Sequence, residues 1–325
     1  MKKTIAVLGG GDSSESVISV KSAAQVIQNI DHEKFLPFLV HVKGSDWNVE
    51  ISKEVKIKVN KDDFSFEYYG KRIKFDCAFI IIHGTPGENG ILQSYFDLLK
   101  VPYTTCSAFS SALTFNKYAT KLFLKEHDIK LAKDFFMRKK DKIDIKEIVK
   151  AVGLPAIVKP NNGGSSFGIT LVKELDQLEP AIKRAFEEDG EVLIEEFLKS
   201  RELTCGVFKG KKKEYILPIT EIISQNEFFD YEAKYEGASR EVTPAEIPAA
   251  LQRTIKDLSS KIYDILDCKG VVRIDYLYNA KGLYFMEINT VPGQSEASII
   301  PQQVRAAGYN LVDFYSELIE DAVGN

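Results

Sequence analysis

The chain of 325 residues lacks the markers of several protein classes. Its four cysteines show no CxxC spacing, which argues against a zinc site or a disulfide framework and favours reduced thiols in the core. No apolar run approaches about 18 residues, so no membrane span is predicted. The N-terminus enters a strand-like run without the length or cleavage signal of a secretory peptide, and we therefore expect a cytoplasmic protein. The net charge of −4 at pH 7 argues mildly against a nucleic-acid partner.

Two nucleotide-binding signatures are absent or incomplete. The P-loop pattern GxxxxGK[ST] does not occur, so any nucleotide must be held in another way. The turn reads Gly9-x-Gly11-x-x-Ser14, which lacks the third glycine of the dinucleotide fingerprint and disfavours a dinucleotide oxidoreductase. Glu15 follows in the first turn of the expected helix, where its carboxylate complements the helix dipole. Contact with the ammonium group of a ligand is the alternative role for this carboxylate.

The pattern of apolar residues predicts alternating strands and helices in the first third of the chain. Strands are expected at 4–9, 35–42 and 76–83, with helices at 13–29 and up to 99. This alternation predicts an open, mainly parallel sheet over about the first 100 residues. Strands and helices then mix, with strands expected at 134–138, 155–159, 168–172 and 192–196, and helices at 107–113, 117–127, 144–152 and 245–266. The polar, tyrosine-rich segment 225–243 lacks clear periodicity and is predicted to be a loop.

The segment with the most information is a pair of strands near the C-terminus. One strand ends in Arg273-Ile274-Asp275 and the other in Glu287-Ile288-Asn289, and the short link 278–282 predicts a hairpin. Side chains alternate along a strand, so a hairpin centred near residue 280 places all four polar side chains on one face. Isolated buried charge is costly and must be compensated. Oxygen ligands beside an arginine suggest Mg²⁺ that carries phosphates.

A second candidate site is the loop 160–168, which is rich in glycine and hydroxyl side chains and follows Lys159. Backbone N–H groups and hydroxyls in such a loop can surround phosphate oxygens, while a lysine neutralises their charge. An ordinary long hairpin loop is the alternative. The strand of buried type that leads into Lys159 favours the phosphate site.

Three other polar residues stand at or near strand ends. Glu195 and Glu202 can accept hydrogen bonds from an adenine amino group or from ribose hydroxyls, or they can face solvent at a sheet edge. His83 ends an apolar strand at a glycine loop, where open α/β sheets bind ligands. From the residues alone, a structural histidine with satisfied hydrogen bonds is the preferred interpretation.

Taken in order, these segments resemble the ATP-grasp superfamily, and within it the D-alanine–D-alanine ligases. The similarity runs nearly end to end, and the common order and spacing of the pieces make it specific. The matching pieces are AVLGGGDSSESVIS at 6–19, HGTPGENGILQSYFDLLKVPYTTC at 83–106, GLPAIVKPNNGGSSFG at 153–168, EVLIEEFLKSRE at 191–202, FDYEAKY at 229–235 and MEINTVPGQSEASIIP at 286–301. Two departures are the sequence Asn-Asn-Gly-Gly-Ser-Ser after Pro160 and Asn89, where an aspartate is usual.

The resemblance implies a three-domain ATP-grasp fold of α/β and α+β class. An N-terminal Rossmann-like domain is expected at 1–105 and a central subdomain at 106–198. The C-terminal subdomain at 199–325 is expected to carry the metal site and a lid loop at 225–243.

The resemblance also implies the residues that bind ATP and metal. The metal ligands would be Asp275, Glu287 and Asn289, which hold two Mg²⁺ ions, with Mn²⁺ as an alternative. The nucleotide contacts would be Lys117 and Lys159 at the phosphates, Glu195 and the Phe197-Leu198 backbone at adenine, Glu202 at the ribose, and Lys234 of the lid at the γ-phosphate.

For the amino-acid substrates, the resemblance places Glu15 near the ammonium group of the first D-alanine, which replaces the helix-dipole role. Ser165 and Tyr235 would tie Glu15 to the lid, and His83 would lie near the first substrate. The oxyanion site would consist of Arg273 and the Gly293 backbone. Ser298, with Ile299 beside it, would contact the carboxylate of the second substrate.

The implied reaction is the ATP-dependent ligation of two D-alanine molecules through an acyl phosphate, for peptidoglycan precursor synthesis, by a homodimer. A D-alanine–D-lactate ligase is the nearest alternative, which Tyr235 disfavours, and another ATP-grasp carboxylate–amine ligase is more distant. A regulatory nucleotide-binding protein without turnover is a further alternative. The complete charged set argues against a regulator, because a sensor need not keep an oxyanion arginine.

Overall fold

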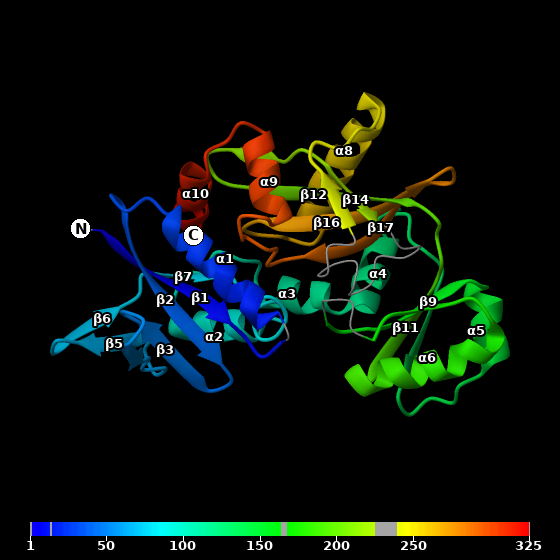
Figure 1. Ribbon diagram of the computed structural model, residues 1–325, viewed down its shortest axis with the longest axis horizontal. Helices are drawn as coiled ribbons and strands as arrows, with labels where there is room; N and C mark the ends of the chain where they lie inside the picture. The colour runs from blue at the N-terminus through cyan, green and yellow to red at the C-terminus, as the bar shows by residue number, and fades with distance from the viewer. Residues whose placement is uncertain (1, 14, 164–167, 225–238, 325) are drawn as a thin grey trace.

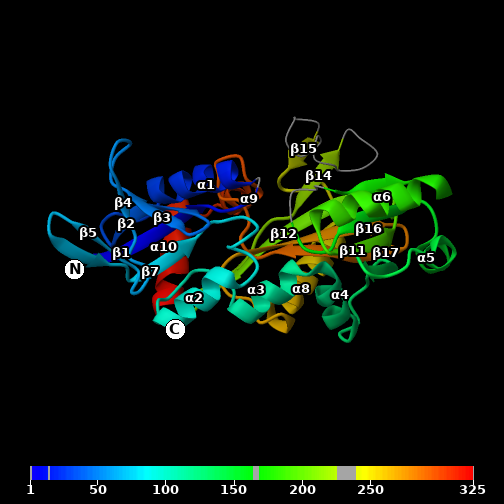
Figure 2. The ribbon, with the colours of Figure 1, turned by 90° about the horizontal axis from the view of Figure 1, so that it is seen from below.

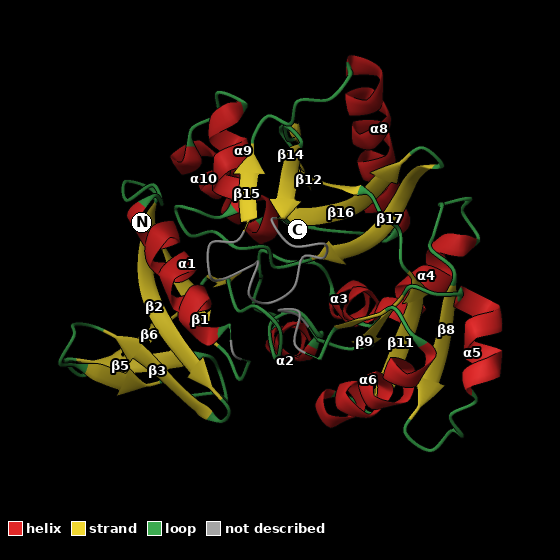
Figure 3. Cartoon of the chain, turned by 45° about the vertical axis from the view of Figure 1, so that its right-hand side comes forward, coloured by secondary structure: helices red, strands yellow, loops and turns green. Residues whose placement is uncertain are grey.

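The chain folds around three main β-sheets, which lie in separate parts of the molecule with helices packed on them (Figures 1 and 3). The computed structural model describes residues 2–13, 15–163, 168–224 and 239–324. Parallel and antiparallel strand pairs both occur, in agreement with the expected combination of α/β and α+β structure.

The first sheet has the strand order β4-β3-β2-β1-β7 and belongs to the N-terminal part of the chain. Its strands are β1 (Lys3–Gly10), β2 (Phe35–Lys43), β3 (Asp46–Glu50), β4 (Lys56–Lys58) and β7 (Cys77–Ile80). Helix α1 (Ser16–Gln28) packs on β1 and β2, and a separate hairpin of β5 (Ser65–Tyr68) and β6 (Lys71–Lys74) lies nearby. Helix α2 (Ile91–Leu99) contributes Leu92 and Phe96 to the apolar core on one face of the sheet.

The prediction of a mainly parallel first sheet was wrong for half of its strand pairs. β1 pairs in parallel with β2 and β7, but β2 with β3 and β3 with β4 are antiparallel. The reason is the two-residue link 44–45 between β2 and β3, which is too short for a parallel crossover. The sequence analysis did not predict β3 or β4.

The second sheet has the order β10-β9-β11-β8 and is antiparallel at every strand pair. Its strands are β8 (Asp134–Arg138), β9 (Ala156–Pro160), β10 (Thr170–Val172) and β11 (Glu191–Glu196). Helices α5 (Ile145–Val152) and α6 (Leu175–Glu188) share one apolar core with this sheet, to which Met137, Ile148, Val158 and Ile182 contribute.

The third sheet has the order β15-β14-β12-β16-β17, with β13 paired to β12. Its strands are β12 (Arg201–Lys209), β13 (Glu214–Ile216), β14 (Thr220–Ser224), β15 (Ser239–Val242), β16 (Val272–Asn279) and β17 (Gly282–Asn289). Helix α8 (Ala249–Ile265) packs on β12, and α3 (Ala108–Phe115) lies against β17. Helices α2, α3 and α4 (Lys117–Lys125) follow one another along one side of the molecule (Figure 2).

The predicted lid loop 225–243 is partly a strand. Residues 239–242 form β15, which pairs antiparallel with β14, so the loop prediction was wrong for this end of the segment. The rest of the predicted lid, 225–238, lies outside the described residues. The strand forms because pairing with β14 satisfies backbone N–H and C=O groups that a loop would leave to water. The sequence did not indicate it because a short polar strand of this kind shows no clear alternation of polar and apolar residues.

The first and third sheets are joined by the C-terminal helices α9 (Ile299–Ala306) and α10 (Leu311–Val323). One apolar core includes Val7 of β1, Phe79 of β7, Phe208 of β12 and Tyr315 of α10. The rings of Phe79 and Tyr315 meet edge to face, with centroids 5.9 Å apart. The N-terminal sheet is therefore packed directly against the C-terminal part of the chain.

The four cysteines are buried and unpaired, as predicted from their spacing. None of the helices in the described ranges combines the length and apolar character needed to cross a lipid bilayer.

Candidate active site

The polar face of the β16–β17 hairpin is the centre of the candidate site. Asp275 stands directly opposite Glu287, and Arg273 stands opposite Asn289. Residues paired across antiparallel strands point to the same side, so the prediction that these four side chains share a face is confirmed. Thr204 on the neighbouring strand β12 is paired with Asp275 and lies on the same face.

The reason for this shared face is a β-bulge, which the sequence did not indicate. The turn pairs Asn279 with Gly282, and this register continues to the pair of Tyr276 and Phe285. Without a change, the same register would place Glu287 opposite Ile274, on the other side of the sheet. One extra residue in β17 shifts the pairing after Tyr276 and returns Glu287 to the side of Asp275.

Asp275 is almost fully buried, with 1% of its surface exposed, and its carboxylate is surrounded by donors. Arg273 Nε lies 2.9 Å from Oδ1 and one terminal guanidinium nitrogen lies 2.8 Å from Oδ2. Asn289 Nδ2 donates to Oδ2 at 3.0 Å, and the Thr204 hydroxyl donates to Oδ1. Burial acts to lower the pKa of Arg273, but the Asp275 carboxylate outweighs it and raises that pKa above its ordinary value. Arg273 is therefore a permanent cation.

The donors on this face fit a hard divalent cation. Two opposed carboxylates and one side-chain amide, Asp275, Glu287 and Asn289, supply the oxygen ligands that Mg²⁺ prefers. Within the described ranges, no group of three or more His, Cys, Asp or Glu residues is placed to hold a metal ion, so the proposed ligand set depends on the amide oxygen of Asn289 as well as on the two carboxylates.

Lys117 approaches this face from the start of α4. Its ammonium group donates to the carbonyl oxygen of Gly163 at 2.5 Å, and its backbone N–H donates to Asn161 O at 3.2 Å. Desolvation lowers the pKa of Lys117, while the negative charge of Glu287 acts in the opposite direction. The structure thus brings together the predicted phosphate lysine, the glycine-rich loop and the predicted metal ligand.

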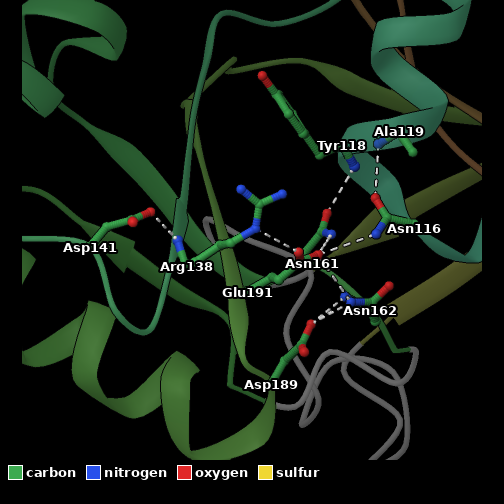
Figure 4. A network of polar contacts seen from close by, with 9 residues as sticks. All are labelled: Asn116, Tyr118, Ala119, Arg138, Asp141, Asn161, Asn162, Asp189 and Glu191. Carbon is green, nitrogen blue, oxygen red and sulfur yellow. Dashed lines mark hydrogen bonds and ion pairs between the residues drawn. The ribbon is translucent and has the colours of Figure 1, made fainter.

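Figure 4 shows the polar network that fixes this arrangement. Asn161 is fully buried; its Oδ1 accepts from the Tyr118 N–H at 2.8 Å and its Nδ2 donates to Glu191 Oε2 at 2.8 Å. Asn162 donates twice to Asp189 Oδ2, at 2.7 and 2.9 Å. These bonds hold the end of β9 to the start of α4, so the position of Lys117 follows from that of the loop.

Lys159 and Glu195 form a buried ion pair at the junction of β9 and β11. The second Glu195 oxygen contacts Lys121, whose ammonium group also lies 2.7 Å from Asp134 Oδ2 and 2.9 Å from Ala132 O. Burial acts to raise the pKa of Glu195, but Lys159 and Lys121 outweigh it and lower that pKa to about 2. The sequence analysis missed Lys121, although its position four residues after Lys117 puts both on one side of α4.

The other predicted nucleotide contacts lie near this ion pair and along β12. The N–H of Phe197 donates to Pro155 O at 3.0 Å, and the Leu198 carbonyl accepts from the Ser200 hydroxyl at 2.8 Å. Glu202 precedes Thr204 by two residues on β12 and so lies on the face of Asp275. Lys234, Ser165 and Tyr235 lie outside the described residues.

Glu15 lies close to Gly84, the residue that follows His83. Glu15 Oε2 lies 3.9 Å from the position that a Cβ on Gly84 would occupy. His83 Nδ1 lies 2.7 Å from Val291 O, and its Nε2 lies 3.4 Å from the Ser22 hydroxyl. The buried imidazole is therefore held between α1 and the segment that follows β17.

Glu88 is a further acid in this region that the sequence analysis did not single out. Its Oε2 accepts from the Gly84 N–H at 2.7 Å and its Oε1 from the Val291 N–H at 3.1 Å. Desolvation and the nearby charge of Glu15 raise the pKa of Glu88 to about 7. Its position between two glycines of the loop 84–90 was the available signal.

Gly293 and Ser298 are brought together at the start of α9. A Cβ on Gly293 would lie only 2.7 Å from Ser298 Oγ, and the Ser295 N–H donates to the same oxygen at 3.0 Å. Ile299 begins α9 and is buried. The predicted oxyanion backbone and the predicted carboxylate contact of the second substrate are therefore neighbours.

Comparison with known proteins matches both halves of the chain to one family. Residues 4–106 match the D-ala D-ala ligase N-terminus and residues 123–320 match the D-ala D-ala ligase C-terminus. The chain belongs to the D-ala D-ala ligase family. The family resemblance expected from the sequence is thus confirmed, and with it the ATP-grasp fold class.

Individual members of the family are similar over their whole length. A D-alanine--D-alanine ligase from Phocaeicola vulgatus is 48% identical over 322 residues, which cover 99% of both chains. The solved structure of the VanG D-Ala:D-Ser ligase from Enterococcus faecalis has a TM-score of 0.89 at 31% identity, covering 98% of this chain and 99% of its own. The ATP complex of the Bacillus anthracis D-alanine--D-alanine ligase has a TM-score of 0.80 at 28% identity, covering 99% and 98%.

Proposed function

We propose that this chain is an ATP-dependent, ADP-forming ligase that joins two D-alanine molecules into D-alanyl-D-alanine for peptidoglycan precursor synthesis. The observation that carries the proposal is the polar face of the β16–β17 hairpin. Asp275 and Glu287 stand opposite each other beside Arg273, and Lys117 approaches from α4. The family assignment over nearly the whole chain supports the same reaction.

The first step must bring two anions together, because the carboxylate of one D-alanine attacks the γ-phosphate of ATP. The products of this step are an acyl phosphate and ADP. We assign Lys117 and Lys159 to the phosphates of ATP, where their positive charges offset the repulsion. Lys159 then exchanges its Glu195 partner, at least in part, for phosphate oxygen.

In the second step the amine of the other D-alanine attacks the acyl carbon, and inorganic phosphate leaves. The tetrahedral intermediate carries an oxyanion. We propose that the Arg273 guanidinium and the Gly293 N–H donate hydrogen bonds to this oxyanion. One such preorganised donor typically stabilises the transition state by about 3–4 kcal/mol. Ser298, beside Gly293, is proposed to hold the carboxylate of the second substrate, with Ile299 next to it.

Two Mg²⁺ ions, or Mn²⁺ ions in their place, are proposed to bind Asp275, Glu287 and Asn289. When bound, they would neutralise the charge of the phosphates. Thr204 donates to Asp275 from the neighbouring strand and so fixes the orientation of this carboxylate.

The remaining assignments follow the family resemblance. They are Glu195 with the Phe197-Leu198 backbone at adenine, Glu202 at the ribose, Lys234 at the γ-phosphate, Glu15 and His83 at the first D-alanine, and Ser165 and Tyr235 between Glu15 and the lid. We also propose the division into 1–105, 106–198 and 199–325, a homodimer, and a cytoplasmic location.

A different second substrate is the alternative that the comparisons favour. The VanG structure, with a TM-score of 0.89, is that of a D-Ala:D-Ser ligase, so this fold accommodates more than one nucleophile. D-serine and D-lactate are therefore included as competing substrates in the test.

The test is mass detection of the product after incubation with ATP, Mg²⁺ and D-alanine, together with assay of phosphate release. We expect D-alanyl-D-alanine, and phosphate release that depends on added D-alanine. Glu287→Gln should nearly abolish turnover, whereas Glu214→Gln, an exposed acid in the same sheet, should leave it unchanged. Phosphate release without dependence on D-alanine, or exclusive use of D-serine or D-lactate, would contradict the proposal.

A further inference from the structure

A single carboxylate joins two loops that are far apart in the sequence. Glu88 accepts the Gly84 N–H within its own loop and the Val291 N–H, which is 203 residues away. His83 Nδ1 lies 2.7 Å from Val291 O and forms the third bond of the junction. Because a carbonyl oxygen can only accept, the hydrogen of this bond must lie on His83 Nδ1. Both backbone polar groups of Val291 are therefore held by the segment 83–88.

Val291 lies between two residues that the proposed function assigns to the site. It follows the proposed metal ligand Asn289 by two residues and precedes Gly293, the proposed oxyanion donor, by two residues. Val291 is buried, and the next anchor is the Gln294 N–H, which donates to the Ser22 hydroxyl at 3.1 Å. The position of the Gly293 N–H is thus set by Val291 on one side and Gln294 on the other.

The loop that carries Glu88 is also held by hydrogen bonds of its own. The Gly87 and Glu88 N–H groups donate to Gly84 O at 2.9 and 2.8 Å, and Gln93 Nε2 donates to Gly87 O at 2.6 Å. A Cβ on Gly87 would lie 2.0 Å from Ile82 O, so only glycine fits this approach.

The same loop is bonded to the glycine turn that leads to Glu15. The Asp12 N–H donates to Thr85 O at 3.1 Å, and the Ser13 hydroxyl donates to His83 O at 2.9 Å. The loop therefore contacts the turn before the proposed first-substrate residue and the segment of the proposed oxyanion donor. It can fix the distance between them.

We infer that Glu88 is a positioning residue for the second step of ligation: it holds Val291, and through it the Gly293 N–H, in place relative to the acyl group bound near Glu15. This inference rests on the proposed function. The bond from the Val291 N–H to Glu88 Oε1 is the link that sets this position. Loosening it displaces the oxyanion donor, and displacements of about 1 Å can cost on the order of 100-fold in rate.

The test compares Glu88→Gln with Glu67→Gln, which changes an exposed acid on β5. In Glu88→Gln the terminal amide can accept at one end only, so either Gly84 or Val291 loses its acceptor. Wild type is assayed first for dipeptide formation, so that failure of the proposed function is seen separately. The kinetic readouts are kcat for dipeptide, KM for ATP and the ratio of phosphate to dipeptide.

We expect Glu88→Gln to lower kcat by about tenfold or more, with KM for ATP within about twofold of wild type. Phosphate should exceed dipeptide, because water captures the acyl phosphate that the second amine does not. Hydrogen exchange of the segment 290–294 should become faster, while that of α5 stays unchanged. If Glu88→Gln does not fold, Glu88→Asp, whose shorter side chain cannot reach both N–H groups, takes its place.

Two results would overturn the inference. One is kinetics equal to those of Glu67→Gln in a folded Glu88 variant. The other is a loss of activity that accompanies a lower melting temperature and a weaker affinity for ATP, with one phosphate still released per dipeptide, because this pattern indicates only a structural role.

Discussion

Replacement of Glu195 by glutamine tests the ion bridge between the second sheet and α4. The Glu195 carboxylate contacts Lys159 and Lys121, whose side chains are only 8% and 5% exposed. Its pKa of about 2, in place of the ordinary 4.5, corresponds to about 3 kcal/mol of stabilisation of the native state. Glutamine has the shape of the protonated acid and cannot provide this stabilisation, so we expect the free energy of unfolding to fall by about 3 kcal/mol at pH 7.

The dependence on pH separates this effect from a loss of packing. The native pKa of Glu195 lies below its ordinary value, so its contribution is complete above about pH 4.5 and is lost as the pH falls toward 2. The difference between wild type and Glu195→Gln should therefore shrink to about 2 kcal/mol at pH 3.5. Urea unfolding followed by circular dichroism measures it, with the exposed Glu187→Gln as control. A difference below about 1 kcal/mol at pH 7, or one that grows on acidification, would refute the reasoning.

Three further predictions concern the substrate side of the site. Gly293→Ala places a methyl group about 2.7 Å from Ser298 Oγ. The KM for the second D-alanine should therefore rise about tenfold, while the KM for ATP stays unchanged. Steady-state kinetics in which the variant and the wild type have the same KM for the second D-alanine would contradict this. Thr204→Val removes the hydroxyl that donates to Asp275 and should raise the Mg²⁺ concentration for half-maximal activity about tenfold, as seen in a Mg²⁺ titration. Tyr235→Phe should raise the ratio of phosphate to dipeptide, and an unchanged ratio would exclude its proposed role in coupling.

The elements with a clear apolar period were predictable from the sequence. The strand 134–138 and the helix 144–152 agree with β8 and α5 to within one residue, because each buries one face against a shared core. The strand β4 was missed for the opposite reason, whereas β3 does alternate polar and apolar residues and its pattern was overlooked. β4 reads Lys-Ile-Lys at a sheet edge and is largely exposed, and edge strands of this composition carry no clear alternation.

The polar face of the hairpin shows where a correct prediction rested on incomplete reasoning. Alternation placed Arg273 with Asp275, and Glu287 with Asn289, which the structure confirms. The alignment of the two pairs depends on a one-residue bulge between the turn and Glu287. A bulge depends on the packing of both sheet faces, so the sequence of one hairpin does not reveal it.

Residues that hold other residues were the hardest to predict, and the reason is physical. Lys121 acts on a carboxylate 74 residues away and Glu88 on a backbone N–H 203 residues away, so neither has a local pattern. Each nevertheless sits next to a group that the sequence did identify, one helical turn from Lys117 or five residues after His83. A charged residue that is buried beside a predicted ligand must have a partner, because isolated buried charge is too costly. That partner is therefore a second position at which substitution should alter the site without touching the substrate.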